Sequence, residues 1–470
     1  MDRKRIDAYF EAHQQEMLED ICRLVRIRSV REQAEPGKPF GHGPWLVMEE
    51  ARKLVEEKGF AVRNFEHYVM DADLPGKDGK APTLGILAHL DVVEEGRGWT
   101  MDPYTPVIKD GCIFGRGTAD DKGPAVAGLY AMMAAREIEP ELTKGVRLIL
   151  GSAEETGSED LDYYLKKEKA PEWCFSPDAD FPVINIEKGR YAPKFFAQWE
   201  ESAVLPRVRS VKGGATVNIV PQNAEAVIEG LDADAVQQAC DAKAAETGVR
   251  FTVTAQADGS VLVEAEGVGS HASYPQEGKN AQAALVALLS GLPLADCPQK
   301  QMLDKLAALF PFDDYGGKAM GVYAEDDISG PLTLAFTVLE LDGKGFTGAM
   351  DARLPICVNG EAFRAAVTQV LAEQGIEAPL KYVVKPHHTP EESTFVQTLL
   401  KAYEQYTGTK GECLAIGGGT YVHSIEGGVA FGCTMPGTDN RMHGADEFVV
   451  IQEIVDSAKI FTQVILDMCR

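Results

Sequence analysis

The stretch Leu84-Gly85-Ile86-Leu87-Ala88-His89-Leu90-Asp91 combines an apolar run with two polar side chains at its end. The apolar residues predict a buried strand over Thr83–Asp91. His89 and Asp91 are two positions apart, so both side chains project from the same side of an extended chain. Divalent metals such as zinc accept imidazole nitrogen and carboxylate oxygen together. We therefore predict that His89 is a metal ligand and that Asp91 orients its ring.

Helix and strand patterns alternate around this stretch. Glu49–Lys58 and Gly123–Ile138 have helical spacing, and Val146–Gly151 is a second apolar strand. This alternation predicts an α/β domain with a mainly parallel sheet covered by helices. Ligands of such sheets bind beyond the carboxyl ends of the strands, which is where His89, Asp91, Glu154 and Glu155 lie.

The pattern changes after Gly189. The strands predicted there are Arg207–Val220, Phe251–Glu266, Leu332–Leu341 and Gly348–Val358, and the helices are Asn280–Ser290 and Glu361–Gln374. The first pattern returns near residue 385, with a helix opening at Pro390, a strand at Gly428–Cys433 and a helix over Asp446–Met468. A chain of 470 residues exceeds one simple core. We expect one discontinuous α/β domain, formed by residues 1–186 and 385–470, and an inserted α+β domain of residues 187–384.

Composition excludes several classes of partner. The net charge of −26 repels phosphate, so we expect no nucleic-acid partner. No apolar run approaches the ~20 residues of a membrane helix, and the N-terminal sequence does not resemble a signal peptide. The nine cysteines are scattered without a CxxC pair, which favours reduced thiols and a cytoplasmic protein.

A second cluster lies in Gly115-Arg116-Gly117-Thr118-Ala119-Asp120-Asp121-Lys122-Gly123-Pro124. Asp120 and Asp121 could cap the helix that follows. The surrounding glycines also permit close backbone approach and unusual dihedral angles, which favours a ligand site. The sequence leaves both interpretations open.

Three further clusters complete the set. Glu154 and Glu155 follow the strand Val146–Gly151, and adjacent carboxylates can divide the work of metal ligand and general base. Asp178 in Ser176-Pro177-Asp178 and His443 in Asn440-Arg441-Met442-His443 have loop and structural interpretations when each is taken alone.

Together, in this order, the five clusters resemble the dinuclear zinc aminoacylase, carboxypeptidase G and carnosinase family over nearly the whole chain. The stretches Phe181–Asn185 and Gly417–Tyr421, with the long insert, are most similar to the bacterial PepV-type dipeptidases. The resemblance implies a catalytic domain with an inserted lid domain, two divalent cations per chain and a cis Asp120–Asp121 peptide bond. Zinc is the expected metal, and manganese and cobalt are alternatives.

The resemblance also implies roles. Asp120 would bridge both metals, His89 and Asp178 would complete one site, and Glu155 and His443 the other. Glu154 would be the general base and Asp91 the residue that orients His89. In the insert, His271 would donate to the oxyanion. The remaining substrate-binding residues would be Asn218, Arg353, Gly418 and Thr420.

The implied activity is hydrolysis of unblocked dipeptides, including β-Ala-Xaa peptides, by a monomeric cytoplasmic enzyme. A deacylase or carboxypeptidase of the same family would use the same metal chemistry, so it remains an alternative. A non-catalytic binding protein would have lost Glu154 or a ligand, and this sequence retains them all.

Overall fold

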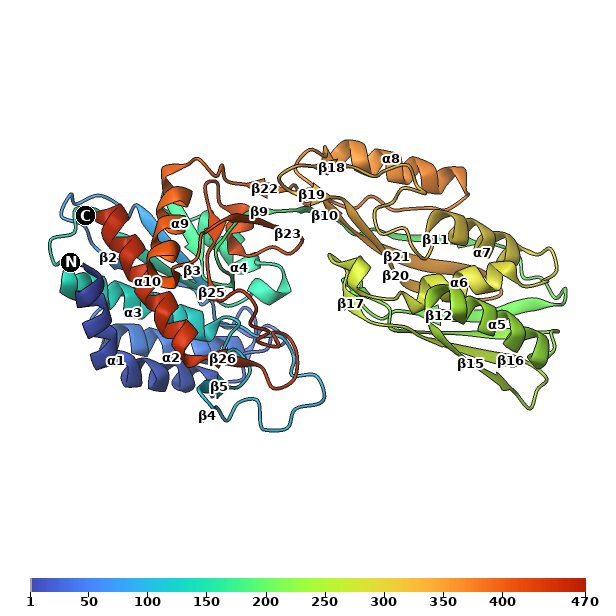
Figure 1. The fold of residues 1–470 in the computed structure, drawn as a ribbon, viewed down its shortest axis with the longest axis horizontal. Helices are drawn as coiled ribbons and strands as arrows, with labels where there is room; N and C mark the ends of the chain where they lie inside the picture. The colour runs from blue at the N-terminus through green and yellow to red at the C-terminus, as the bar shows by residue number, and fades with distance from the viewer. Residues whose placement is uncertain (1) are drawn as a thin grey trace. The chain divides into compact units, whose positions relative to one another are not determined.

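The computed structural model describes residues 2–470, which form two compact units (Figure 1). Unit 1 comprises Met1–Ile186, His388–Leu414 and Gly419–Arg470, and unit 2 comprises Glu187–His387 and Ala415–Gly418. The expected boundary at residue 385 is therefore shifted, and a short segment near residue 416 changes unit. A backbone hydrogen bond accounts for the second difference, because the Lys188 N–H donates to Ile416 O.

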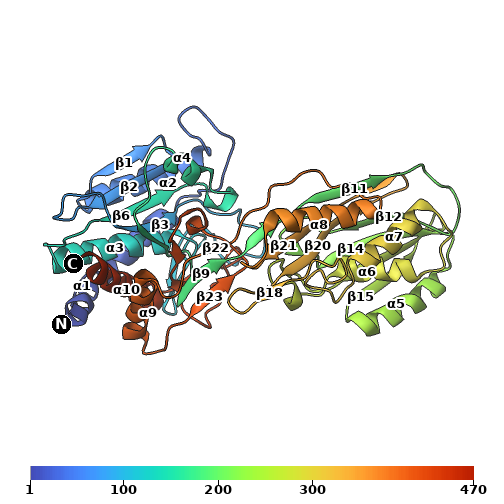
Figure 2. The ribbon, with the colours of Figure 1, turned by 90° about the horizontal axis from the view of Figure 1, so that it is seen from above.

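A nine-stranded sheet forms the centre of unit 1 within residues 2–470. Its path is β1 (Val62–Phe65), β2 (Val69–Leu74), β6 (Val146–Gly151), β3 (Leu84–His89), β7 (Trp173–Ser176), β24 (Val429–Ala430), β9 (Val183–Glu187) and β22 (His387–His388), with β23 (Cys413–Ile416) beside β9. The central pairs β6–β3, β3–β7 and β7–β24 are parallel, and antiparallel pairs flank them. Figure 2 shows β1, β2 and β6 in succession.

Helices cover both faces of this sheet. The central strands β3 and β6 are therefore buried along their whole length. Alternate residues of β3 and β6 pack against one group of helices, and the others pack against a second, smaller group. The larger group is α1 (Asp2–Val25), α2 (His42–Glu57), α3 (Lys122–Ile138), α9 (Thr394–Thr407) and α10 (Ile451–Cys469), and the smaller is α4 (Glu159–Leu165) with η3 (Tyr421–Ser424). This arrangement confirms the predicted α/β class.

Two predicted elements of unit 1 begin later than expected. Helix α9 starts at Thr394, because the Ser393 hydroxyl caps it by accepting from the Val396 N–H. The chain from Phe448 to Val450 is strand β26, and α10 starts only at Ile451. β26 pairs with β5 (Cys112–Phe114), which in turn pairs with β4 (Val107–Lys109). The predicted strand Gly428–Cys433 is two short strands, β24 and β25 (Cys433–Thr434), of which β25 pairs with β8 (Ala179–Asp180).

Unit 2 is an α+β unit with an antiparallel sheet. The strands are β10 (Gly189–Tyr191), β21 (Gly345–Leu354), β20 (Thr333–Leu341), β12 (Arg207–Gly213), β14 (Asn223–Glu229), β16 (Val261–Glu266) and β15 (Arg250–Ala255), with β11 (Lys194–Gln198) beside β21. Four helices cover one face: α5 (Ala233–Thr247), α6 (Ala281–Gly291), α7 (Pro298–Leu309) and α8 (Gly360–Glu373). This confirms the predicted α+β character of the insert.

Predicted strands of unit 2 differ in their bounds. The run Arg207–Val220 is interrupted after Gly213 and continues as β13 (Ile219–Val220), which pairs with β17 (Ser270–His271). β21 covers Gly345–Leu354 and ends before Pro355, which lacks the N–H that a ladder needs. The small hairpin β18 (Glu325–Asp326) and β19 (Gly330–Pro331) and the turn η2 (Pro275–Glu277) complete the unit.

Candidate metal centre and active site

His89 ends β3 with both ring nitrogens in defined surroundings. Nδ1 lies 3.0 Å from the backbone oxygen of Asp91, and a carbonyl oxygen only accepts, so Nδ1 carries the proton. Nε2 therefore presents a lone pair. It lies 3.0 Å from Asp120 Oδ1 and 3.5 Å from Asp178 Oδ2, is fully buried, and makes no hydrogen bond of acceptable geometry. A buried lone pair that faces carboxylates repels them unless a proton or a metal cation lies between them, so this arrangement suits a metal ligand.

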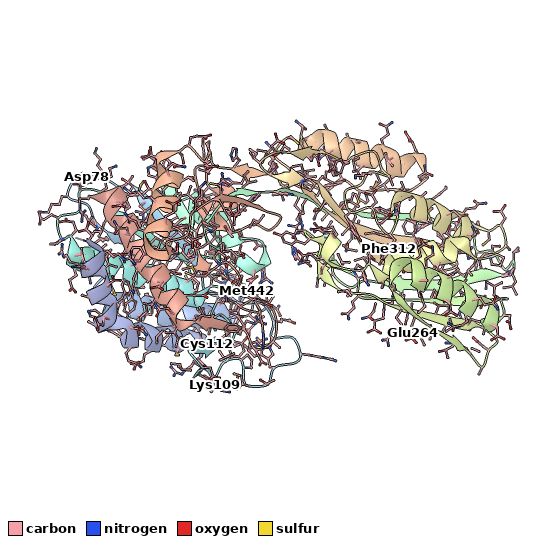
Figure 3. All side chains as sticks on the ribbon, viewed as in Figure 1. Asp78, Lys109, Cys112, Glu264, Phe312 and Met442 are labelled. Atoms are coloured by element: carbon pink, nitrogen blue, oxygen red, sulfur yellow. The ribbon has the colours of Figure 1, made fainter. Side chains whose placement is uncertain are left out.

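Asp120 lies between two imidazoles. Its Oδ1 is the oxygen near His89, and its Oδ2 lies 2.9 Å from His443 Nε2. His443 directly follows Met442, which is labelled in Figure 3. A carboxylate with one oxygen toward each of two imidazoles has the donor arrangement of a ligand shared by two cations.

Asp121 does not cap helix α3, although the sequence allowed that interpretation. It occupies the N-cap position without a capping hydrogen bond from its side chain. Its Oδ2 instead accepts the backbone N–H of His89 at 2.9 Å, so this carboxylate fixes the end of β3. The Asp120–Asp121 peptide bond is cis, as the resemblance implied.

The turn after β6 supplies two more carboxylates, and the end of β7 leads to a third. One set of possible ligand atoms within 4.8 Å of one another comes from His89, Glu154 and Asp178, and another from His89, Asp120 and Glu155. Glu155 Oε1 also lies 3.2 Å from His443 Nε2. The structure thus gathers all five predicted metal ligands and Glu154 into one cluster in unit 1.

Electrostatics indicate that this cluster suits divalent cations. Burial and the neighbouring carboxylates raise the pKa of Glu154 well above its usual range, and burial and the charge of Asp120 raise the pKa of Asp178 to about 7. Burial disfavours a charged His89, but the nearby carboxylates of Asp120, Asp178 and Asp91 outweigh burial and raise the pKa of His89. Four carboxylates that share one buried site repel each other, and two divalent cations would neutralise them.

The unpartnered lone pair of His89 Nε2 shows that these residues fit divalent metals, and this observation does not depend on the family resemblance. Imidazole together with carboxylate is a donor set of zinc and of manganese, and it includes no thiolate. Cobalt accepts the same ligands, so the donor set does not distinguish among the three.

Asp91 has a wider role than the sequence indicated. Its carboxylate accepts the backbone N–H groups of Glu154 and Glu155 at 3.1 and 3.2 Å, and its Oδ1 lies 3.4 Å from His89 Nδ1. One buried side chain thus ties the end of β3 to η1 (Glu154–Thr156), the turn that follows β6.

Sequence reasoning missed the residues that support these turns. Asp160 in α4 accepts the Ser152 and Ala153 N–H groups at 2.6 and 2.8 Å, and the Tyr421 hydroxyl also donates to it. Glu447 and Arg116 form a second buried support. These polar residues resemble ordinary surface residues in the sequence, and only their burial distinguishes them.

Unit 2 carries Asn218 and His271 on neighbouring segments. Ile219 pairs with His271 across β13 and β17, and the Asn218 carbonyl accepts the Ala272 N–H at 2.8 Å. The His271 Nδ1 contacts the Ser273 hydroxyl. Both Asn218 and His271 are exposed, so their side chains are accessible to a ligand.

Arg353 in β21 is buried and held in a fixed orientation. Its Nε and Nη2 donate to Asp351 at 2.6 and 3.2 Å, and its Nη1 donates to the Gly417 carbonyl. Arg190 also donates to Asp351, at 2.9 Å. Two guanidinium groups therefore face one carboxylate and leave a net positive charge, which suits an anionic ligand group.

The two other predicted substrate-binding residues fall in different units. Gly418 belongs to unit 2, and a Cβ there would meet only Ile416 at 3.7 Å, so this backbone is open to close approach. Thr420 belongs to unit 1, and its hydroxyl caps η3 by accepting the Val422 N–H.

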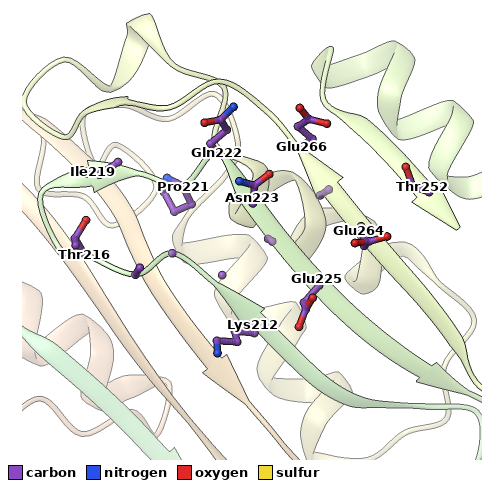
Figure 4. A pocket seen from close by; sticks show the side chains of 15 residues that line it. Lys212, Thr216, Ile219, Pro221, Gln222, Asn223, Glu225, Thr252, Glu264 and Glu266 are labelled. Atoms are coloured by element: carbon purple, nitrogen blue, oxygen red, sulfur yellow. The ribbon is translucent and has the colours of Figure 1, made fainter. Parts of the chain in front are cut away.

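A wide hollow lies elsewhere, on the face of the unit 2 sheet that helices do not cover. It measures about 760 Å³ and is lined by β12, β14, β16 and β15 (Figure 4). Lys212, Glu225 and Glu264 lie opposite one another on successive strands, and Thr252 continues the row. A mixed row of this kind is typical of a solvated sheet face, and it contains no imidazole.

The sequence matches one family model, "Peptidase family M20/M25/M40", over residues 85–467. The chain belongs to this family. Membership makes it a peptidase, and the matched segment includes every residue of the cluster in unit 1.

Curated M20 relatives match this chain from end to end. A putative dipeptidase of Bacillus subtilis, YtjP, is 33% identical over 97% of this chain and 98% of its own length. The β-Ala-Xaa dipeptidase of Lactobacillus delbrueckii subsp. lactis is also 33% identical, over 98% of this chain and 97% of its own.

Solved structures share the fold. Human carnosine dipeptidase 1 aligns with a TM-score of 0.61 at 17% identity, covering 100% of this chain and 99% of that one. The aminoacylhistidine dipeptidase of Vibrio alginolyticus aligns with a TM-score of 0.57 at 14% identity, covering 97% and 96%. At these identities the likeness establishes the fold of this M20 chain. None of the helices within residues 2–470 has the length and apolarity that crossing a membrane requires.

Proposed function

We propose that this M20 peptidase is a metal-dependent dipeptidase that hydrolyses free dipeptides, β-Ala-Xaa peptides among them. The observation that carries the proposal is the cluster in which His89 Nε2 presents a lone pair to Asp120 and Asp178. The end-to-end match to relatives named as dipeptidases supports the substrate class.

The residues of unit 1 would divide two tasks. His89, Asp120, Asp178, Glu155 and His443 would hold two divalent cations, with Asp120 shared between them. Bound there, such cations supply Lewis acidity and lower the pKa of water.

Glu154 would act as general base and then as general acid. Its carboxylate would take a proton from the attacking water and return it to the leaving amine. Burial and neighbouring carboxylates raise its pKa, which strengthens the carboxylate as a proton acceptor. Asp91 would keep the Nδ1 proton of His89 in place, so that Nε2 always faces the cations.

The residues of unit 2 would recognise the substrate. Arg353, held rigidly by Asp351, would bind the C-terminal carboxylate in bidentate fashion. His271 would donate to the developing oxyanion, a contribution of roughly 3–4 kcal/mol in comparable cases. Asn218 would bind the substrate through its amide, and Gly418 and Thr420 through their main chain.

Three finer properties form part of the proposal. We propose zinc as the metal, as the resemblance implies, and manganese and cobalt, which accept the same imidazole and carboxylate ligands, are the alternatives. We propose a monomer in the cytoplasm, and the free state of all nine cysteines within the described residues supports a reducing compartment. Sedimentation of the purified chain would test the monomer.

The decisive experiment is hydrolysis of a substrate panel by the zinc-loaded protein. The panel comprises free dipeptides, N-blocked dipeptides, tripeptides and N-acyl amino acids. The proposal requires a kcat/KM for free dipeptides at least tenfold above that for every other class. Preference for N-acyl amino acids would establish a deacylase, and preference for N-blocked dipeptides a carboxypeptidase.

A further inference from the structure

A short strand pair brings two distant loops of unit 1 together. β26 lies beside β5 (Figure 1). In the register of this pair, Phe448 lies opposite Phe114. The residues just beyond this pair are Glu447 on one strand and Gly115 on the other, and the Gly115 N–H donates to the Glu447 carbonyl at 2.9 Å. The loop that follows Gly115 carries Asp120, and the loop that precedes Glu447 carries His443.

The Glu447 carboxylate is fully buried beneath the Asp120 loop. Its Oε1 accepts three backbone N–H groups, from Gly117 and Ala119 at 3.0 Å each and from Asp120 at 3.3 Å. These bonds fix the main chain that positions the carboxylate between His89 and His443.

Arg116 connects the same carboxylate to the other loop. Its Nη1 donates to Glu447 Oε2 at 2.6 Å, and its Nη2 donates to the Gly444 carbonyl at 3.0 Å. Gly444 follows His443 directly, and Arg116 is itself 1% exposed. One guanidinium group thus bridges the chain next to Asp120 and the chain next to His443.

The His443 loop needs such support. Arg441, His443 and Asp446 have φ angles of 56°, 61° and 55°, in the left-handed region that residues other than glycine rarely adopt. Such conformations persist where surrounding contacts impose them. Besides the bridge from Arg116, Asp446 accepts the Thr100 N–H at 2.8 Å.

We propose that Glu447 and Arg116 are positioning residues of the metal centre, which hold Asp120 and His443 at the spacing that divalent cations require. This inference goes beyond the proposed function, because it concerns cation binding and can be tested without any peptide. Residues that orient metal ligands contribute about 10- to 100-fold to metal affinity in other proteins.

The principal test is Glu447→Gln. Both oxygens of Glu447 face N–H donors, so a glutamine amide directs its NH₂ group at donors in either orientation. Titration of the metal-stripped protein with zinc should show at least one of the two cations bound about 10- to 100-fold more weakly than in the parent. The visible spectrum of the cobalt-loaded variant should also differ from that of the parent, because the ligand geometry changes.

Asp71→Asn is the matched control. Asp71 is also buried in unit 1, and its two oxygens accept hydrogen bonds from Arg63 and Tyr164. An asparagine there would likewise point its NH₂ group at hydrogen-bond donors, but at a site away from the cluster. This control should lose thermal stability but keep the zinc affinities of the parent. Parental zinc affinities in Glu447→Gln, or an equal loss in Asp71→Asn, would overturn the inference.

Arg116→Lys provides a second measurement if Glu447→Gln does not fold. Lysine keeps the charge but cannot reach Glu447 and Gly444 with a planar fork. We expect this variant to fold and to bind zinc at least several-fold more weakly, with a shifted cobalt spectrum. Unchanged zinc affinity and an unchanged spectrum in Arg116→Lys would also overturn the inference.

Discussion

At the residue scale, neighbouring carboxylates of this site have different functions because their surroundings differ. Asp120 faces two imidazoles, and the adjacent Asp121 accepts the backbone N–H of His89. Glu154 and Glu155 form a similar pair, in which Glu155 contacts His443 and Glu154 has no such partner among the described ion pairs. Residue type alone does not assign these roles, since each pair consists of two identical residues.

The division of roles between Glu154 and Glu155 gives the first prediction. Glu154→Gln should lower kcat by about 10²- to 10⁴-fold, because the proton acceptor is lost, and it should retain both cations. Glu155→Ala should lose a cation, because its carboxylate is a proposed ligand. Metal content by elemental analysis and kcat on a free dipeptide measure both effects. Loss of a cation from Glu154→Gln, with both retained in Glu155→Ala, would show that the two roles are reversed.

At the element scale, the sequence predicted the central strands β3 and β6 and missed several shorter strands and their pairing. β3 and β6 are continuous apolar runs, and the sequence pattern shows where each run ends. The pattern alone therefore predicted that His89, Glu154 and Glu155 lie at strand ends. Strand β26 has only three residues and was read as part of a helix. The contact between Arg116 and Glu447 spans 331 positions, and no local pattern signals it.

The clustering of the proposed metal ligands followed only in part from the predicted strands. His89 and Asp91 end one predicted strand, Glu154 and Glu155 follow another, and the topological rule for parallel sheets placed these two clusters at one edge. Asn218, His271 and Arg353 were identified only through the family resemblance, because an exposed asparagine, an exposed histidine and a lone arginine carry no pattern of their own. The antiparallel flanks of the unit 1 sheet depend on tertiary pairing and were not predicted.

The turn after β6 gives a prediction about pH. Burial and the charge of Asp91 raise the pKa of Asp160 to about 6, from an ordinary value of 3.8. The folded chain therefore binds a proton more tightly than the unfolded chain. The stability that this proton contributes is complete below about pH 4 and is lost as the pH rises through 6. The shift corresponds to about 3 kcal/mol.

Asp160→Asn should remove this pH dependence. The free energy of unfolding is measured with urea in the presence of a chelator. Between pH 4 and pH 7 it should fall more in the parent than in the variant. The two decreases should differ by about 3 kcal/mol. The chelator keeps metal affinity from contributing. Equal slopes in parent and variant would contradict the assignment of this titration to Asp160.

At the scale of the whole molecule, the two units have separate cores and separate tasks. The proposed metal ligands all belong to unit 1, and the proposed carboxylate anchor belongs to unit 2. Metal removal and loss of the anchor should therefore have different signatures.

Removal of metal should abolish hydrolysis and destabilise unit 1. A cation present at 100 times its dissociation constant stabilises a folded unit by about 2.7 kcal/mol. Calorimetry of the chelated protein should therefore show a thermal transition at lower temperature, restored by zinc, with a second transition from unit 2 that zinc does not move. Asp120→Ala is the control, since without the shared ligand zinc should stabilise it much less. Full activity in a verified metal-free preparation would contradict the metal dependence.

The anchor in unit 2 gives the last prediction. Arg353→Ala should reduce kcat/KM for free dipeptides by at least 100-fold and for C-terminally amidated dipeptides by much less, because only the free carboxylate accepts a bidentate guanidinium. Arg209→Gln is a matched control for the loss of one positive charge, since Arg209 lies in β12 of the same unit and pairs with Glu229 and Asp258. The control should keep the parental ratio between the two substrates. Equal losses on free and amidated dipeptides in Arg353→Ala would show that Arg353 stabilises the unit 2 sheet through Asp351 and does not bind the substrate carboxylate.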